Sequence, residues 1–529
     1  MTGLVADVLL TNAEFVTLDG AASAIAILGD RIVATDEVPA CEVIDLGGAT
    51  VTPGFHDAHN HMAWFGLTLG EVDCRVDSLD ALYAAIGAAA AAAPEDAWVV
   101  GYGYDQNKCG AHPTREGLDR VAGGRRVWVK HTSGHMCVVN SPVLRELGLD
   151  EHPAEVDGGL VVVDAAGRPT GLLQETAQAL INPLMLPYPV DTLVEAIDRA
   201  GQVYLREGIT SATEAGIGGG WIGRTPVELE AYQRARELGR LHTRVELMVV
   251  LDVLHPVTEL GLGLDLGLRT GFGDDWLSIG PVKIFSDGSL IGHTAAMCHD
   301  FADTPGERGY LQASAEALTE AILAAHHGGW RVATHAIGDA AIDLVLDAYE
   351  QAQRTLPRPD VRHRIEHFGV ARPDQVARAR QLNVIPVPQG RFVNEIGDGM
   401  LRAVGPERAA YVYRQRSLLD AGIVVPGSSD RPVVTGTPLL GIHDLVNQLT
   451  SSGAPFAPDE AVTGLEALRA WTYGSAYAAK QEHLKGTLSV GKLADLVVLS
   501  DNPATVPPDR IRDIEVLRTM VGGTFRWSA

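Results

Sequence analysis

Three histidines fall within six positions of the stretch "VTPGFHDAHNHMAWFG", at His56, His59 and His61. Because alternate residues of a strand point to one face, His59 and His61 would present both imidazoles on the same side. Two imidazoles placed in this way could supply two ligands of a metal site, for which zinc is the commonest metal. His56 would face the other way, so we interpret it as structural. Such a pair also arises without a metal, so the interpretation depends on further ligands.

Four further polar residues lie at or near the ends of apolar runs. His335 lies in "RVATHAIGD" and His367 lies in "HRIEHFG". Asp430 ends "IVVPGSSD", and Lys283 lies inside "GPVKIFSDG". Each residue alone has an ordinary interpretation, such as a hydrogen-bonded core histidine or a capping aspartate. Together with the histidine pair, their common position at the ends of different predicted strands favours one metal site.

Lys283 is the least ordinary member of this set. A charged lysine inside an apolar strand is costly unless it is paired, and an ammonium group has no lone pair to give a metal. If the amine takes up carbon dioxide it becomes a carbamate, a carboxylate-like anion that can bridge two cations. The alternative is a salt bridge from Lys283 to Asp430 or Asp287. The residues themselves leave both interpretations open.

Eight apolar runs alternate with helical stretches in the interior of the chain, and this pattern predicts an α/β fold with a (β/α)8 TIM barrel. The runs are "TPGFHDAH", "ITSATEAG", "VELMVVLD", "GPVKIFSDG", "RVATHAIGD", "HRIEHFG", "NVIPVPQG" and "IVVPGSSD". The alternative is a doubly wound open sheet. A G-x-G-x-x-G turn after a first strand would support that alternative, and "GIGGGWIG" does not occur in that setting.

The predicted barrel comprises residues 51–66 and 208–484, and the gap between its first two runs, 67–207, is close to a domain in size. Chemistry in such barrels takes place at the C-terminal ends of the strands. We therefore expect the 67–207 insertion to stand over the active-site mouth. Short strands are also predicted at both chain ends, and we expect residues 1–50 and 485–529 to form one small β unit.

The composition excludes several classes of function. A formal charge of −25 argues against binding to nucleic acid or to an anionic membrane surface. Five scattered cysteines without a C-x-x-C pair indicate neither a thiolate zinc site nor a disulfide framework. The first residues make a poor signal peptide, and no apolar run is suited to span a bilayer. We expect a cytoplasmic enzyme that acts on a small molecule and forms a homo-oligomer (a dimer).

The motifs together resemble the amidohydrolase superfamily, through nearly the whole chain. They are "PGFHDAHNH", "VKIFSDGSL", "THAIGDAAID", "RIEHFG", "GSSDRPV" and "GTLSVGKLADLVVLSDNP". "GHMCVVNSPVLRELG" and "PTGLLQETA" in the insertion are similar to the branch that includes N-substituted formamide deformylase. The resemblance implies a TIM barrel with a small β-sandwich built from both chain ends, and a binuclear metal centre.

The same resemblance implies a set of ligands for two divalent metal ions, with zinc as the expected metal. His59 and His61 would hold one metal with Asp430. His335 and His367 would hold the other, and carboxylated Lys283 would bridge the two. Such a pair of cations lowers the pKa of a bridging water toward neutrality and yields hydroxide. Asp430 would act as general acid and base, which describes hydrolysis of a carbonyl C–N bond.

The expected substrate is a neutral, largely apolar amide, such as an N-formyl, N-acyl or cyclic amide. Apolar and aromatic segments surround the predicted mouth, and no basic cluster for phosphate is evident. We expect substrate contacts from His135 in the insertion, from Asp287, and from His293, which stands where relatives often have an arginine.

Three alternatives remain open at this point. A deaminase on the same scaffold usually manages with one metal and lacks the bridging lysine. A phosphotriesterase would share the metal set. A non-catalytic homologue would be expected to have lost a ligand.

Overall fold

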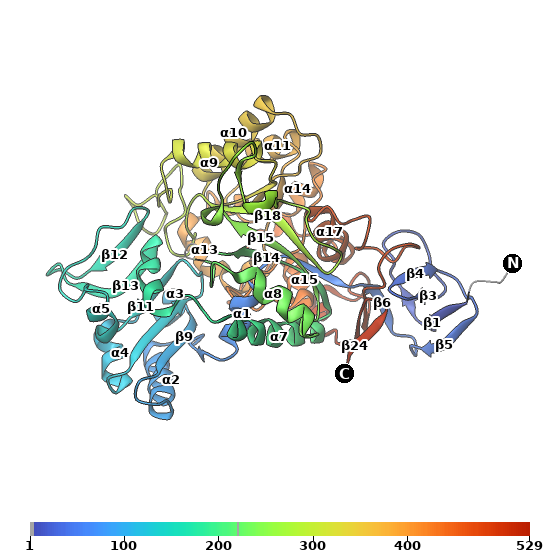
Figure 1. Cartoon of the computed structure of the whole chain (residues 1–529), viewed down its shortest axis with the longest axis horizontal. Helices are drawn as coiled ribbons and strands as arrows, with labels where there is room; N and C mark the ends of the chain where they lie inside the picture. Colours follow the sequence, from blue (N-terminus) through green and yellow to red (C-terminus); the bar gives the residue numbers. More distant parts are fainter. Residues whose placement is uncertain (1–4, 220–221) are drawn as a thin grey trace.

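The computed structural model describes residues 5–219 and 222–529. Seven parallel strands form its central sheet, which lies in the middle of Figure 1. Their spatial order follows the chain. They are β7 (Phe55–Asn60), β14 (Ile209–Ile217), β15 (Arg244–Val250), β18 (Leu277–Phe285), β19 (Val332–Ala336), β20 (Arg364–His367) and β21 (Ile385–Val387). These strands are almost entirely buried, as expected for a parallel sheet covered by helices. The barrel prediction is therefore confirmed.

The eighth predicted strand, residues 423–430, is an extended segment without regular strand pairing. It nearly closes the barrel beside β7, where the Asp430 N–H donates to the His59 carbonyl at 2.7 Å. The proline in this segment has no N–H to give a ladder. The Ser429 N–H donates to the Asp57 carboxylate at 3.0 Å, so a side chain takes the place of a backbone acceptor there. The irregular segment holds Asp430 next to the strand that carries the histidine pair.

Helices cover the outside of the barrel. The longer ones are α7 (Val190–Arg206), α8 (Glu228–Glu237), α9 (Ala315–His327), α10 (Asp339–Thr355), α11 (Pro373–Gln381) and α15 (Pro438–Asn447). In α10, for example, Ile342, Val345, Leu346 and Tyr349 are fully buried at helical spacing, which places one apolar stripe on the sheet. Within the described residues, no helix is both long and apolar enough to cross a membrane.

Residues between β7 and α7 form a separate mixed sheet with its own helices, on the left in Figure 1. Its strands are β8 (Val72–Asp73), β9 (Trp98–Tyr104), β10 (Arg126–His131), β11 (Met136–Val139), β12 (Gly159–Val163) and β13 (Pro169–Glu175), with helices α2 (Leu79–Ala92), α4 (Arg115–Ala122) and α5 (Ser141–Glu146). The loop after β10 touches the barrel where the Thr132 hydroxyl donates to the Val433 carbonyl at 2.7 Å. The insertion thus contacts loops at the carboxyl ends of the barrel strands.

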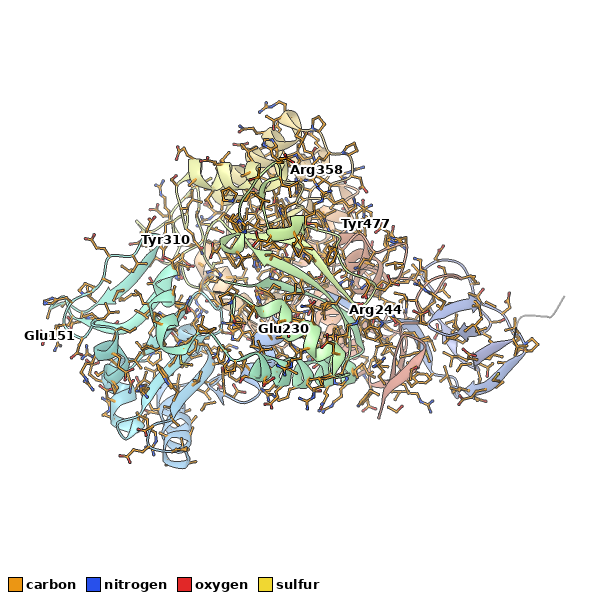
Figure 2. The ribbon with its side chains drawn as sticks, viewed as in Figure 1. Glu151, Glu230, Arg244, Tyr310, Arg358 and Tyr477 are labelled. Carbon is orange, nitrogen blue, oxygen red and sulfur yellow. The ribbon has the colours of Figure 1, made fainter. Side chains whose placement is uncertain are left out.

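The chain ends form two further sheets, on the right in Figure 1, of which the first is N-terminal and the second combines both ends. One contains β1 (Ala6–Thr11), β3 (Ile25–Leu28), β4 (Arg31–Ala34) and β5 (Ala40–Asp45), and the other contains β2 (Glu14–Phe15), β6 (Thr50–Pro53), β22 (Leu496–Leu499), β23 (Val516–Val521) and β24 (Thr524–Ser528). β6 and β22 pair directly, which joins the two ends of the chain. Arg244 of the barrel, labelled in Figure 2, forms a buried ion pair with Asp495 at 2.6 Å. The prediction that the two chain ends form a β unit is confirmed, because their strands share one sheet.

Candidate metal centre

A small chamber of about 20 Å³ lies at the carboxyl ends of the barrel strands. Its polar lining includes His135, His335, His367 and Asp430. A larger hollow of about 450 Å³ lies among the loops that precede the strands and includes Arg358 (labelled in Figure 2). In barrels of this type the active site lies at the carboxyl ends of the strands, whereas residues at the opposite face contribute to stability. The small chamber is therefore the candidate site, despite its lesser volume.

Three buried side chains gather ligand atoms in one place. One atom each from His59, His367 and Asp430 lies within 4.8 Å of the others. His61 belongs to the same group, because its Nε2 and the Nε2 of His59 each lie 3.2 Å from Asp430 Oδ1. The structure thus brings together the histidine pair of β7 and the aspartate of the irregular eighth segment.

The hydrogen bonding of His59 supports a cation in this group. Its Nδ1 donates a short hydrogen bond to the Glu366 carboxylate, which leaves a lone pair on Nε2. That nitrogen is buried and has no hydrogen-bond partner among the described residues, yet it faces the Asp430 carboxylate. Two acceptors at this distance repel one another unless a cation lies between them. Imidazole and carboxylate are ordinary ligands of divalent metals such as zinc.

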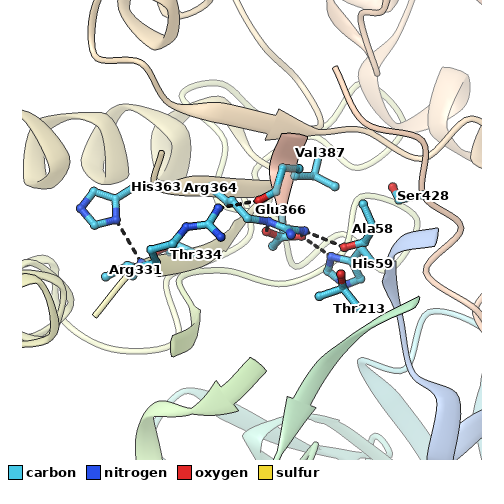
Figure 3. Close-up of polar contacts among 12 residues, drawn as sticks. Ala58, His59, Thr213, Arg331, Thr334, His363, Arg364, Glu366, Val387 and Ser428 are labelled. Atoms are coloured by element: carbon cyan, nitrogen blue, oxygen red, sulfur yellow. Dashed lines mark hydrogen bonds and ion pairs between the residues drawn. The ribbon is translucent and has the colours of Figure 1, made fainter. Parts of the chain in front are cut away.

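Glu366 fixes this tautomer, and its own charge is held by Arg364 (Figure 3). The Arg364 Nε donates to Glu366 at 2.7 Å, and a second nitrogen donates to the Ala58 carbonyl at 2.7 Å. Burial would raise the pKa of Glu366, but Arg364 and His59 hold it well below its ordinary value. A carboxylate behind a metal-binding histidine is a common arrangement. Our reasoning from the sequence missed Glu366, although two charges at alternate positions of a buried strand are the signal for such a pair.

Asp430 is a carboxylate in this setting. Burial would raise the pKa of Asp430, but the neighbouring imidazoles of His59 and His61 hold it well below its ordinary value. His61 also approaches Glu214, at the end of β14, with 3.6 Å between Nδ1 and Oε1. Burial would lower the pKa of His61, but Asp430 and Glu214 raise it. Glu214 is a second acidic neighbour that sequence reasoning did not single out.

His335 and His367 stand side by side, with ring centroids 4.5 Å apart. Burial lowers the pKa of His367 to about 3 and that of His335 well below its ordinary value. Both rings are therefore neutral, which is the form that binds metals. His367 donates from Nδ1 to Gln389 at 2.8 Å, so its Nε2 keeps a lone pair.

Lys283 is fully buried on β18, with its Nζ 4.7 Å from the centroid of the Phe285 ring. In the part of the chain that the structure describes, this amine makes no ion pair. The alternative salt bridge to Asp430 or Asp287 is therefore not formed. Burial lowers the pKa of the Lys283 amine to about 8, which leaves more of it neutral near pH 7 than an exposed lysine would have.

The structure places His135 in the chamber, next to the metal-binding candidates. Its ring centroid lies 5.0 Å from that of His335. Nδ1 donates to the buried Glu175 carboxylate of the insertion at 2.7 Å. Burial would lower the pKa of His135, but Glu175 raises it above its ordinary value. The insertion thus contributes a histidine whose orientation is fixed by its own acidic partner.

The other two expected substrate contacts lie elsewhere. The Asp287 oxygens accept three backbone N–H groups at 2.8–3.0 Å, from the loops that follow β18 and β19. Asp287 therefore ties those loops together behind His335. His293 pairs with Asp303 at 2.9 Å, is a quarter exposed, and is not part of the chamber lining. The turn at His293 directs the ring toward Asp303, and the predicted substrate contact stays a prediction.

Replacing Glu366 with glutamine is expected to weaken metal binding by about 10–100-fold, because partners behind a ligating histidine typically contribute that much. The amide keeps the shape but no longer favours the tautomer with a free Nε2. Competition with a chromophoric chelator measures the change in zinc affinity. Glu230→Gln, at an exposed side chain of α8 (Figure 2), is the matched control. Unchanged affinity in a folded Glu366→Gln protein would contradict this role for Glu366.

Comparisons with known proteins agree with this geometry. Residues 42–526 match the model of the amidohydrolase family. The chain is 31% identical to N-substituted formamide deformylase of Arthrobacter pascens, over 98% of both proteins. It is 31% identical to the protein LONG AFTER FAR-RED 3 of Arabidopsis thaliana, over 98% of this chain and 91% of that protein.

Among solved structures, an uncharacterized metal-dependent hydrolase from Pyrococcus horikoshii OT3 superposes with a TM-score of 0.73 at 27% identity. That match covers 95% of this chain and 99% of the other. The family match covers most of the chain, and the buried histidine and aspartate group occupies the face of the barrel where chemistry is expected. The chain belongs to the amidohydrolase family and is a metal-dependent hydrolase of that family.

Proposed function

We propose that the protein hydrolyses a carbonyl C–N bond of a small-molecule amide in the chamber at the carboxyl ends of the barrel strands. The observation that carries the proposal is the convergence of His59 Nε2 and His61 Nε2 on Asp430 Oδ1, at 3.2 Å each. The similarity to a relative named as a deformylase supports an N-formyl or N-acyl amide. The name of that relative describes removal of a formyl group from a formamide, which breaks the bond between a carbonyl carbon and nitrogen.

Two divalent metal ions, with zinc as the expected metal, would be held by side chains from different strands. His59, His61 and Asp430 would hold one, and His335 and His367 would hold the other. Lys283, carboxylated on its amine, would bridge them. When bound, such a pair of cations supplies an activated water and polarises the substrate carbonyl.

Asp430 would carry the proton. As a carboxylate it accepts the proton of the attacking water while the new C–O bond forms at the carbonyl carbon. It then gives that proton to the nitrogen as the C–N bond breaks, so that the products are a carboxylic acid and an amine. His135, held by Glu175, would donate a hydrogen bond to the substrate from the opposite, insertion side of the chamber.

The chamber wall favours an apolar group next to the reacting carbonyl. Leu290, Ile337, Phe392, Met400 and Val433 line it. We expect these side chains to exclude water and to contact the apolar part of the amide. The insertion loop that carries Ser133 and His135 would roof the chamber, as expected from the sequence.

Protein purified without chelator is expected to contain close to two divalent ions per chain, because the proposed ligands serve two cations. Elemental analysis measures this, and a panel of N-formyl, N-acyl and cyclic amides measures activity before and after metal removal. Full activity without metal would overturn the proposal. One ion per chain would favour a mononuclear deaminase, and activity on phosphotriesters alone would favour that class.

Two further expectations stay predictions. A dimer is tested by light scattering of the purified protein. A cytoplasmic location is tested by fractionation of the native cells.

A further inference from the structure

A second cavity, of about 30 Å³, lies between the insertion and the barrel. Five side chains define what we call the Arg224 pocket: Trp64, Trp128, Lys130, Gln178 and Arg224. By the usual measure of about 10–15 Å³ for each water, it has room for about two waters or a group of similar size. Its lining differs from that of the chamber, because two cations and two indole rings meet there.

Arg224 is buried without a counter-ion. It is 8% exposed, and its guanidinium lies over the Trp64 ring with Cζ 5.2 Å from the centroid. Among the residues that the structure describes, no carboxylate pairs with it. Its backbone is fixed, since its N–H donates to Glu228 at 2.9 Å and its carbonyl accepts the Tyr188 N–H at 3.0 Å. A buried, unpaired cation is costly, so this arrangement indicates a place for an anion.

The neighbouring charges do not compensate Arg224. Lys130 uses one oxygen of Glu71, with 2.6 Å between Nζ and Oε1. One oxygen of Glu228 is occupied by backbone N–H groups, and burial raises the pKa of Glu228 to about 7. Lys130 and Arg224 therefore both line the pocket, and of the two only Lys130 has an acidic partner among the residues that the structure describes. The pocket keeps an excess positive charge, which one monoanionic group would neutralise.

The Arg224 pocket adjoins the chamber. Successive residues of one loop line both cavities, with Ser133 and His135 at the chamber and Gly134 at the pocket. The Trp64 ring spans the same boundary, since its centroid is 5.6 Å from that of His61. Gly134 has a positive φ of 73°, and a Cβ there would lie 2.8 Å from the Trp64 ring. The Trp64 ring thus lies between His61 and Arg224, and a molecule that occupies both cavities would pass beside this ring.

We propose that the Arg224 pocket binds a carboxylate at the far end of the substrate, while the amide carbonyl lies in the chamber. The substrate class would be amides with an apolar middle part and a terminal carboxylate. A planar carboxylate matches the guanidinium fork, which donates two parallel hydrogen bonds. This inference rests on the proposed function for the identity of the reacting bond. It replaces the expectation, drawn from the sequence, of a wholly neutral substrate.

Binding is tested first, because it does not depend on hydrolysis. Calorimetry with the metal-loaded protein would compare 4-methylbenzoate with 4-methylbenzamide, which differ only in charge at one end. We expect the carboxylate to bind about 10–100-fold more tightly, as for hydrogen bonds to charged groups. Arg224→Gln should remove this preference, and Arg224→Lys should keep part of it. Arg234→Gln, at an exposed side chain of α8 paired with Asp191, is the matched control and should change nothing.

Hydrolysis is tested with N-formyl-4-(aminomethyl)benzoate and its benzamide counterpart. We expect Arg224→Gln to raise KM for the carboxylate about 10-fold or more, with little change in kcat and no change for the benzamide. Amide hydrolysis with no preference for the carboxylate, in wild type and variant, would overturn the inference and leave the proposed function standing. Arg224-dependent binding without any amide hydrolysis would support the pocket and overturn the proposed function.

Two further outcomes are decisive. Tighter binding of 4-methylphenylphosphonate than of 4-methylbenzoate would overturn the choice of a carboxylate in favour of a dianion. If circular dichroism shows that Arg224→Gln does not fold, the comparison of the acid with its amide on the wild-type protein decides. Equal affinity of the two probes there would overturn the inference.

Discussion

Replacing Asp430 with asparagine is expected to lower kcat by at least about 10²–10⁴-fold, the usual contribution of a general acid–base group. The amide keeps the size and one oxygen of the carboxylate, but it cannot accept the water proton or return it to the leaving nitrogen. The drop should appear in kcat with any amide that the wild-type protein hydrolyses. Steady-state rates and bound metal are measured on the same preparations.

The control for this variant is Asp303→Asn. Asp303 is partly exposed and pairs with His293 outside the chamber, so its loss should leave kcat unchanged. Because Asp430 is also a proposed ligand, the comparison is made at saturating zinc. Near-normal turnover of Asp430→Asn under those conditions would show that another group carries the proton. A large loss in Asp303→Asn would instead return His293 to the site.

The sequence predicted the part of the site that follows from strand periodicity. His59, His335 and His367 lie on strands whose alternation and ends are readable from apolar runs, and their place at one face follows from the barrel. The irregular segment that carries Asp430 was predicted as a strand. Regular strand pairing is interrupted by its proline and by the hydrogen bond from the Ser429 N–H to Asp57. The apolar run in the sequence does not reveal such an interruption.

What the sequence did not predict depends on contacts between distant segments. Arg224 follows β14, but its surroundings come from α1 (Met62–Thr68) and from the insertion strand β10. Whether a counter-ion lies near it cannot be known before those segments are placed. His293 lies outside the chamber for a local reason. Its backbone turns through a positive φ of 58°, and the ring meets Asp303 where a regular continuation of the chain would lead it elsewhere.

Replacing Lys283 with alanine is expected to remove the bridge and to reduce bound metal from two ions per chain to one or none, with loss of most activity. The physical reason is that the proposed carbamate would supply two oxygens to the metals, which alanine cannot. Elemental analysis after gel filtration measures the loss. Lys480→Ala, at an exposed lysine paired with Asp360, is the matched control and should keep its metal.

The carbamate itself is tested by its formation and by its replacement. It forms only from the neutral amine and carbon dioxide, so adding zinc to apo protein should restore activity further with bicarbonate than without. Acetate or propionate should partly restore metal binding to Lys283→Ala, because a short carboxylate offers the same two oxygens. A simple cation predicts the opposite pattern: no effect of bicarbonate, and substantial activity in Lys283→Arg, which keeps the charge. A bare amine at Lys283 in the density of a fully metallated crystal would end the carbamate proposal, even if the metals were in place.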